Sequence, residues 1–175
     1  KYLDIKKNIN MKISGKNWGL CCNSVHYVDL FKSLIRDREI FITKNNLKNE
    51  IFESKRIGYF ELYGNFCLSN KRGDKLTISC SRYEKNLENI SIKIEIINEK
   101  KKIVCKLIEN KLYIKFIEGK KIKNKIHKFK YQSERTAYEI KKILSKKKSS
   151  LPSYDTSIKD HLNVFDMFYY IFNQN

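Results

Sequence analysis

The residue types that most often carry chemistry are few in this 175-residue sequence, and they are scattered. The three histidines fall in different predicted elements: His26, His127 and His161. The sequence contains no HExxH pattern, no metal-ligand spacing of Cys and His, and neither of the Gly-rich phosphate loops, GxxxxGK[ST] and GxGxxG. The carboxylate pairs Glu84/Glu88 and Glu95/Glu99 have no neighbour that suggests acid–base work. These observations predict a protein that is not an enzyme and holds no metal or cofactor.

The cysteines also give no catalytic or metal-binding pattern. There are five of them, an odd number, and no two stand as CxxC. Cys80 and Cys105 lie in strand-like runs, where cysteine acts as a small core residue, so a reducing compartment fits best. Cys21 and Cys22 are adjacent and precede an amphipathic helix. Such a pair is either a palmitoylation site or two ordinary thiols, and the sequence leaves both open.

Basic residues are the strongest signal for function. The net charge is +18, and the segment 100–148 alone holds eighteen Lys and Arg against four Glu. A charge of this size favours an anionic partner, such as nucleic acid, an acidic membrane leaflet or an acidic protein. The competing explanation is a biased amino-acid composition in which lysine fills solvent-exposed positions.

Apolar periodicity predicts the elements that position these charges. A helix is expected over 25–35 with Ser24 as its N-cap, after an irregular polar arm over 1–17. Strands are expected over 39–43, 57–68, 76–80, 90–96, 103–107, 112–116 and 127–131. Polar loops separate them, among them 44–56, 70–74, 84–89 and the basic loop 119–124. An amphipathic helix is expected from Ser133 to Lys148, and a further helix from Thr156.

Consecutive strands joined by short turns predict an antiparallel meander. Seven such strands would curl into a closed barrel or sandwich, stopped at one end by a helix. The predicted fold class is therefore mainly β with capping helices, an α+β arrangement. The predicted organisation is a polar arm over 1–23, a β-rich domain with its N-terminal helix over 24–148, and a linker with an extra amphipathic helix over 149–175.

This pattern of seven strands and a closing helix, from Glu39 to Lys148, resembles a pleckstrin-homology (PH) domain. The Lys/Asn-rich composition, the flanking segments and Cys21-Cys22 make it similar, within that family, to the acylated PH-domain proteins of apicomplexan parasites. The resemblance implies a headgroup site at the open end of the barrel, formed by two basic loops. Its residues would be Lys44, Lys48, Lys55 and Arg56 in one loop and Lys120, Lys121, Lys123 and Lys125 in the other. Because Lys55 and Arg56 are adjacent, a loose anionic site is favoured over a deep inositol-phosphate pocket.

The function implied is a non-catalytic lipid-binding module. It would recruit a protein to an anionic membrane surface through phosphatidic acid or phosphoinositide headgroups, in the regulated secretion (exocytosis) of microneme-type organelles. We expect a monomer in the cytoplasm, peripheral on the cytosolic face of an organelle or of the plasma membrane.

Two other functions stay open at this level. A PH-like scaffold could use the final helix, which either covers a groove of its own domain or docks a protein partner through its aromatic residues, Phe165, Phe168, Tyr169 and Phe172. Nucleic-acid binding is less favoured. It would use the interleaved lysines and aromatics of 111–115 and 128–131, which are better explained as core positions.

Overall fold

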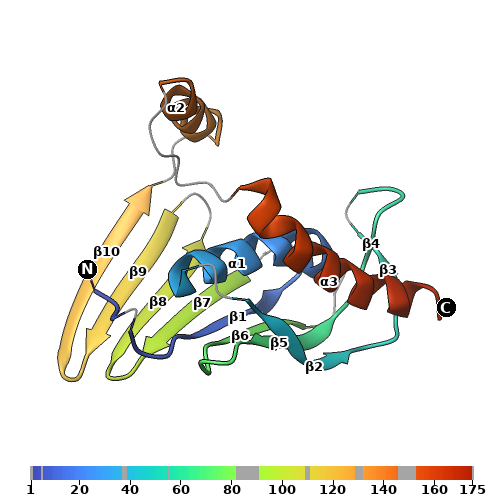
Figure 1. Cartoon of the computed structure of the whole chain (residues 1–175), viewed down its shortest axis with the longest axis horizontal. Helices are drawn as coiled ribbons and strands as arrows, with labels where there is room; N and C mark the ends of the chain where they lie inside the picture. Colours follow the sequence, from blue (N-terminus) through green and yellow to red (C-terminus); the bar gives the residue numbers. More distant parts are fainter. Residues whose placement is uncertain are drawn as a thin grey trace.

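The computed structural model describes residues 2–4, 6–36, 39–54, 56–81, 91–108, 111–128, 132–145 and 153–174. These residues form ten strands and three helices (Figure 1). The strands are β1 (Asn10–Lys16), β2 (Phe41–Leu47), β3 (Phe52–Glu53), β4 (Phe60–Glu61), β5 (Gly64–Ser69), β6 (Lys75–Ser81), β7 (Ser91–Asn98), β8 (Lys101–Ile108), β9 (Lys111–Glu118) and β10 (Lys121–Lys128). The helices are α1 (Leu20–Ile35), α2 (Gln132–Leu144) and α3 (Tyr154–Phe172).

Eight of the strands form one open sheet, in the order β10-β9-β8-β7-β1-β6-β5-β2. Its neighbouring strands are antiparallel except for β1 and β6, which run parallel, while β3 and β4 form a separate short hairpin. The edges of the sheet, β10 and β2, lie at opposite ends of this order and do not pair. The predicted closed PH-like barrel is therefore wrong: the fold is an open mixed sheet with three helices.

The physical reason for this error is β1. Residues 10–16 were expected to be part of an irregular arm, yet β1 lies in the middle of the sheet, between β6 and β7. Met11 pairs with Leu76 on β6 and with Ile96 on β7, and its side chain is buried. Inserting β1 separates β6 from β7, so the meander is interrupted and the sheet stays open.

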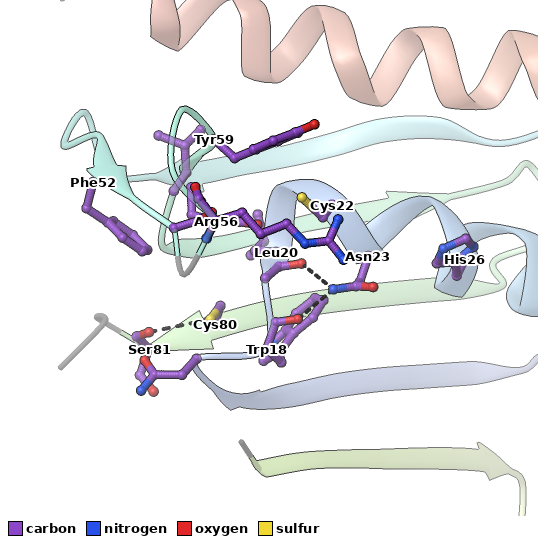
Figure 2. A pocket seen from close by; sticks show the side chains of 15 residues that line it. Trp18, Leu20, Cys22, Asn23, His26, Phe52, Arg56, Tyr59, Cys80 and Ser81 are labelled. Atoms are coloured by element: carbon purple, nitrogen blue, oxygen red, sulfur yellow. Dashed lines mark hydrogen bonds between the residues drawn. The ribbon is translucent and has the colours of Figure 1, made fainter. Parts of the chain in front are cut away.

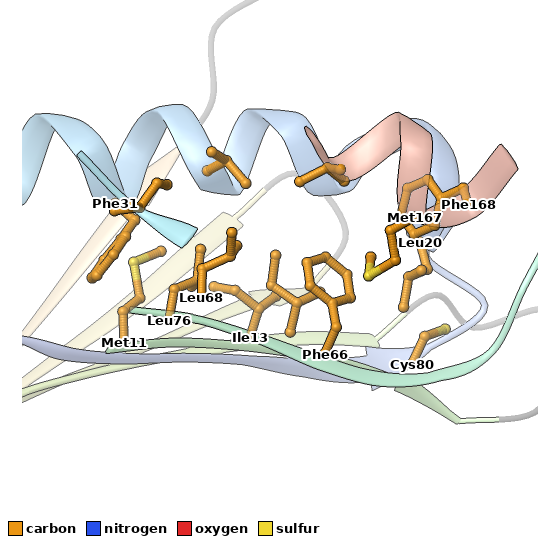
Figure 3. Close-up of a cluster of buried hydrophobic side chains, with 14 of the residues drawn as sticks. Met11, Ile13, Leu20, Phe31, Phe66, Leu68, Leu76, Cys80, Met167 and Phe168 are labelled. Atoms are coloured by element: carbon orange, nitrogen blue, oxygen red, sulfur yellow. The ribbon is translucent and has the colours of Figure 1, made fainter. Parts of the chain in front are cut away.

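Helices α1 and α3 lie on the same side of the sheet and cover its central and β2-side strands (Figure 1). Alternate residues of β1, β5 and β6 point into this layer, because side chains alternate between the faces of a strand. Figure 3 shows the resulting core between sheet and helices, which includes Met11, Ile13, Phe66, Leu68, Leu76 and Phe31. Helix α2 stands apart from both layers in Figure 1.

The final helix, α3, packs on α1 and β2. Phe168 of α3 meets Phe66 of β5 edge to face, with ring centroids 5.9 Å apart. Lys32 of α1 forms an ion pair with Asp160 of α3 at 2.8 Å, and both side chains are at least nine-tenths buried. Apolar and polar contacts together therefore hold α3 against the sheet layer.

Several local predictions match the structure and others do not. The strand predicted over 90–96 is present as β7, and the helices predicted at both ends of the domain are present as α1 and α2. The predicted basic loop over 119–124 is wrong: only Gly119 and Lys120 turn, and residues 121–128 form β10. The turn predicted over 84–89 lies outside the described residues. In the described part of the chain, no helix combines the length and apolar character needed to cross a membrane.

Candidate functional site

A pocket of about 470 Å³ lies where α1 begins. Its walls come from the β1–α1 connection, the first turns of α1, the β3–β4 hairpin and the end of β6 (Figure 2). The lining residues that matter chemically are Trp18, Cys22, Asn23, His26, Ser54, Arg56, Tyr59 and Glu61. These segments are distant in sequence; the pairing of β1 with β6 brings two of them together, and the contact between Cys21 and Glu61 joins the hairpin to α1.

The shape of the pocket floor depends on how α1 starts. Gly19, the N-cap of α1, has φ +72°, a left-handed conformation that glycine adopts without steric cost. A Cβ at this position would lie 3.0 Å from Asn23 Nδ2 and 3.1 Å from Glu61 Oε1. The predicted cap, Ser24, is instead buried within the helix, and the described residues offer its hydroxyl no hydrogen-bond partner. The helix therefore begins five residues before its predicted start at residue 25.

Glu61 supplies the cap that Gly19 lacks. Its carboxylate accepts a hydrogen bond from the backbone N–H of Cys21 at 2.7 Å, and the residue is only 4 % exposed. A carboxylate at a helix N-terminus is stabilised by the unpaired N–H groups and by the helix dipole. Asn23 completes the arrangement by donating its amide N–H to the carbonyl of Trp18 at 2.7 Å and to that of Gly19 at 3.1 Å.

The exposed polar face of α1 provides the pocket's reactive groups. Cys22 and His26 are four residues apart, and Asn23 and His26 are three apart, so all three lie on one face of the helix. Burial raises the pKa of the Cys22 thiol, Glu61 raises it further, and the nearby Arg56 cation lowers it. Cys21 also has a raised pKa, first because of burial and then because of Glu61. Both thiols are therefore protonated at neutral pH, and neither is an activated nucleophile.

Arg56 and Tyr59 enter the pocket from the β3–β4 hairpin. The Ser54 hydroxyl accepts a hydrogen bond from the N–H of Arg56 and donates one to its carbonyl, each at 3.1 Å. The N–H of Tyr59 donates to the carbonyl of Arg56 at 3.1 Å. In Figure 2 the Arg56 side chain extends from this turn toward Cys22 and Asn23 on α1. The hairpin thus holds a guanidinium group at the mouth of the pocket.

The eight predicted headgroup-binding residues do not form one site. Lys44 lies in β2 and Lys48 just after it, both exposed, while Lys55 is outside the described residues. Lys120 is in the β9–β10 turn, and the other three lysines of the second set, Lys121, Lys123 and Lys125, are exposed on β10. Six strands separate β2 from β10. At about 4.8 Å per strand the two sets lie roughly 34 Å apart. Of the seven residues that the structure describes, only Arg56 lines the pocket at α1.

The β10 lysines border a separate hollow of about 470 Å³ with Tyr2, Phe116, Glu118 and Ile122. The Tyr2 hydroxyl donates a hydrogen bond to the carbonyl of Ile117 at 2.6 Å, and the Tyr2 and Phe116 rings meet edge to face. The N-terminal segment therefore already packs against this part of the sheet. The hollow contains none of the His, Cys or Asn groups found at α1.

Comparisons with known proteins show that the fold is shared with proteins named oxidoreductases or dehydrogenases. No protein-family model and no curated protein matches the sequence. The solved structures that are similar to the chain include three proteins named oxidoreductases or dehydrogenases. A protein named an oxidoreductase, from Erwinia carotovora atroseptica, has a TM-score of 0.64 at 10 % identity, over 92 % of this chain and 55 % of its own length. A dehydrogenase (MviM) from Clostridium difficile has a TM-score of 0.55 at 14 % identity, over 96 % and 55 %. An oxidoreductase from Thermotoga maritima has a TM-score of 0.50 at 9 % identity, over 92 % and 50 %.

These likenesses correct the predicted identity and function. The chain does not have a PH fold, so the resemblance to apicomplexan acylated PH-domain proteins is wrong, and so is the lipid-binding function in exocytosis that rested on it. The expectation of a non-catalytic module is wrong as well, because proteins named oxidoreductases and dehydrogenases share this fold. At these identities the likeness establishes the fold alone. The chain spans about half the length of each of these proteins.

Many oxidoreductases bind a dinucleotide with its pyrophosphate at the N-terminus of a helix that follows a Gly-rich turn. The start of α1 does not fit that group. The Cys21 N–H already donates to the Glu61 carboxylate, and this buried anion would repel a pyrophosphate. The sequence also has no GxGxxG pattern. A dinucleotide held by the first turn of α1 is therefore not part of the function proposed below.

Sequence reasoning missed most of the pocket. Glu61 lies in a run of aromatic residues, and no local pattern indicated that it caps α1. His26 was interpreted only as a position on the predicted helix, and Asn23 was assigned to the polar arm before it. One usable signal was present: Gly19 precedes a helical run whose polar residues, Cys22 and His26, are spaced i and i+4.

Proposed function

We propose that this chain is the substrate-binding part of an oxidoreductase, and that the pocket at α1 receives a small hydroxylated molecule. The observation that carries the proposal is the gathering of His26, Asn23 and Arg56 around one pocket, in a fold shared with proteins named oxidoreductases. A pocket of about 470 Å³ is within the range that small-molecule sites occupy, roughly 300–1,000 Å³.

The side chains around the pocket suit an alcohol or polyol. The exposed imidazole of His26 can accept the proton of a substrate hydroxyl or return it. Oxidation of the alcohol also removes a hydride, which would pass to a hydride-accepting cofactor held outside the described residues. The side-chain NH2 of Asn23 donates to the backbone carbonyls of Trp18 and Gly19, and its side-chain oxygen can accept a hydrogen bond from a ligand. The Tyr59 ring on the hairpin provides an apolar face for the carbon skeleton.

Trp18 gives a direct test of this proposal. It is the sole tryptophan in the sequence, it lines the pocket, and its indole N–H donates to the Ser79 carbonyl at 3.2 Å. Titration of the chain with glycerol, sorbitol, glycolate and gluconate should give a saturable change in Trp18 fluorescence with at least one of them. His26→Gln should weaken that response about tenfold, which is the loss of one well-placed hydrogen bond.

The matched control is His127→Gln on β10, which lies at the far edge of the sheet and should leave the response unchanged. Amide chemical shifts recorded in the same titration should move over 17–26 and 54–62. The proposal is refuted if none of the four compounds gives a saturable change, or if the shifts cluster on β8–β10 instead.

A further inference from the structure

Arg56 is the one Lys or Arg side chain among the described residues that line the pocket. Its backbone is fixed by Ser54, and its side chain reaches toward Cys22 and Asn23 (Figure 2). Within the described residues, no carboxylate pairs with its guanidinium group and no side-chain hydrogen bond engages it. Arg72 shows the contrast, because its guanidinium is held by Asp74 at 2.6 Å. A guanidinium held at a pocket without a carboxylate partner is suited to an anion from outside the chain.

Glu61, the acidic residue of the pocket, does not fill that role. Its carboxylate is directed to the N–H of Cys21, and the residue is buried. Breaking that bond to reach Arg56 would uncap α1 and leave the partly buried N–H of Cys21 unsatisfied. Glu61 instead sets a limit on the charge of the ligand, since it contributes one negative charge to the same described lining as Arg56.

This charge balance distinguishes between oxyanions. A phosphate monoester carries about −1.5 to −2 charges at neutral pH and is usually held by several cations or N–H groups. The described lining offers it one guanidinium and one repelling carboxylate. A carboxylate carries one charge, and its two oxygens match the paired N–H groups of arginine in a bidentate arrangement.

We infer that the pocket at α1 binds a hydroxylated carboxylic acid, with its carboxylate on Arg56 and its hydroxyl groups toward the α1 face that carries Asn23 and His26. This inference rests on the proposed function and names the substrate class for it. Ser54 acts as a positioning residue, because it fixes the turn from which Arg56 extends.

The experiment uses Cys22 as a reporter, because the Arg56 cation lowers the pKa of this thiol. A carboxylate bound to Arg56 neutralises that cation, so the thiolate fraction falls and alkylation slows. The rate of Cys22 modification by iodoacetamide is followed by peptide mass spectrometry at fixed pH and ionic strength. The probes are sodium glycolate, its neutral amide glycolamide, sodium phosphate and sodium chloride.

Glycolate should slow Cys22 alkylation saturably, and glycolamide, chloride and phosphate should not. Arg56→Gln should weaken the glycolate effect by about tenfold or more, as expected for loss of a charge-assisted bidentate pair. Arg56→Lys should keep part of it. The matched control, Arg36→Gln, lies at the other end of α1, about 24 Å along the helix, and should behave as the parent chain. Thermal unfolding of each variant checks that the fold is intact.

The outcomes separate this inference from the proposed function. If glycolate acts no differently from chloride, or acts equally on Arg56→Gln, the carboxylate inference is wrong. A saturable Trp18 response to sorbitol in the same samples would then still support the proposed function with a neutral substrate. If phosphate protects Cys22 more strongly than glycolate, the ligand is a phosphate ester and the charge argument fails.

Discussion

The carboxylate of Glu61 accepts a hydrogen bond from the backbone N–H of Cys21 at 2.7 Å, across forty residues of sequence. This contact joins β4 to the first turn of α1, and it closes the floor of the pocket. It also explains why Gly19 is needed at the N-cap: a side chain there would approach the Glu61 carboxylate. The same carboxylate shapes the acidity of Cys21 and Cys22. Glu61 therefore affects both the stability of α1 and the acidity of the thiols at the pocket.

Replacing Glu61 tests its role as a cap. Glu61→Ala should lower the free energy of unfolding by about 1–3 kcal/mol, because the N–H of Cys21 loses its partner in a buried setting. Glu61→Gln keeps an acceptor oxygen and should cost about 1 kcal/mol or less, the share due to the interaction of its charge with the helix dipole. Urea unfolding measures both. Glu53→Ala, on the exposed side of the same hairpin, is the control. Equal losses for the Ala and Gln variants would contradict the capping role.

The Cys22 thiol provides a prediction about pH. Its pKa is raised by burial and by Glu61 and lowered by Arg56, and the thiolate is the reactive form. The pH midpoint of its alkylation should therefore shift down in Glu61→Gln and up in Arg56→Gln. Iodoacetamide rates between pH 7 and 10.5, resolved by peptide mapping, give the midpoints. Cys105 has a pKa raised by burial alone and should not respond to either change. Shifts of the same sign in both variants would show that Cys22 is not held between these two charges.

The buried ion pair between Lys32 and Asp160 should control how firmly α3 is attached. Lys32→Met leaves Asp160 as an unpaired buried charge and should destabilise the chain by about 3–5 kcal/mol. The double variant Lys32→Met/Asp160→Leu removes both charges and should recover most of that loss. A double-mutant cycle by chemical denaturation measures the coupling. The control is Lys159→Met, whose partner Glu39 is exposed, and it should change stability little. If the double variant is as unstable as Lys32→Met, the loss of stability comes from altered packing and not from the unpaired charge of Asp160.

Asp74 should make the protein sensitive to acid. Burial on its own would raise the pKa of Asp74. Hydrogen bonds from the Arg72 and Asn70 side chains and from the N–H of Ile9 outweigh burial and hold the pKa below its usual value. A carboxyl whose pKa is lowered by folding stabilises the folded state above its unfolded pKa, about 3.9, and that stabilisation is lost as the pH falls through the folded value.

The stability of the parent chain should therefore fall steeply below about pH 4, and Asp74→Asn should flatten that part of the curve. At pH 7 the same variant should be less stable by about 2–3 kcal/mol, because hydrogen bonds to a charged group are lost. Urea unfolding between pH 2 and 7 provides both values. Glu118→Gln removes a half-exposed carboxylate and should leave the acid limb unchanged. If Asp74→Asn loses stability below about pH 4 as steeply as the parent chain does, other groups cause the acid sensitivity.

Local periodicity predicted those elements whose pattern repeats within a short stretch of chain. The alternation of Ile92, Ile94 and Ile96 with polar residues defines β7, because successive side chains on a strand face opposite sides. The apolar spacing of Val25, Val28 and Phe31 defines the buried face of α1 in the same way. The types of these two elements were right. β7 begins within one residue of its predicted start, and α1 begins five residues before its predicted start.

The sequence by itself determined the strands from β6 to β9, the three helices and the strong positive charge, since each depends on neighbouring residues or on composition. The tertiary structure decided the rest. β1 is a central strand, and its position could not be predicted locally because the partners of Met11, Leu76 and Ile96, lie 65 and 85 residues further along the chain. Its insertion kept the sheet open, placed the two lysine clusters at opposite edges, and brought Arg56 and Glu61 to the start of α1. The pocket is formed by segments that are far apart in the sequence. Local sequence patterns do not report the free energy of contacts between such segments, so they could not predict the pocket.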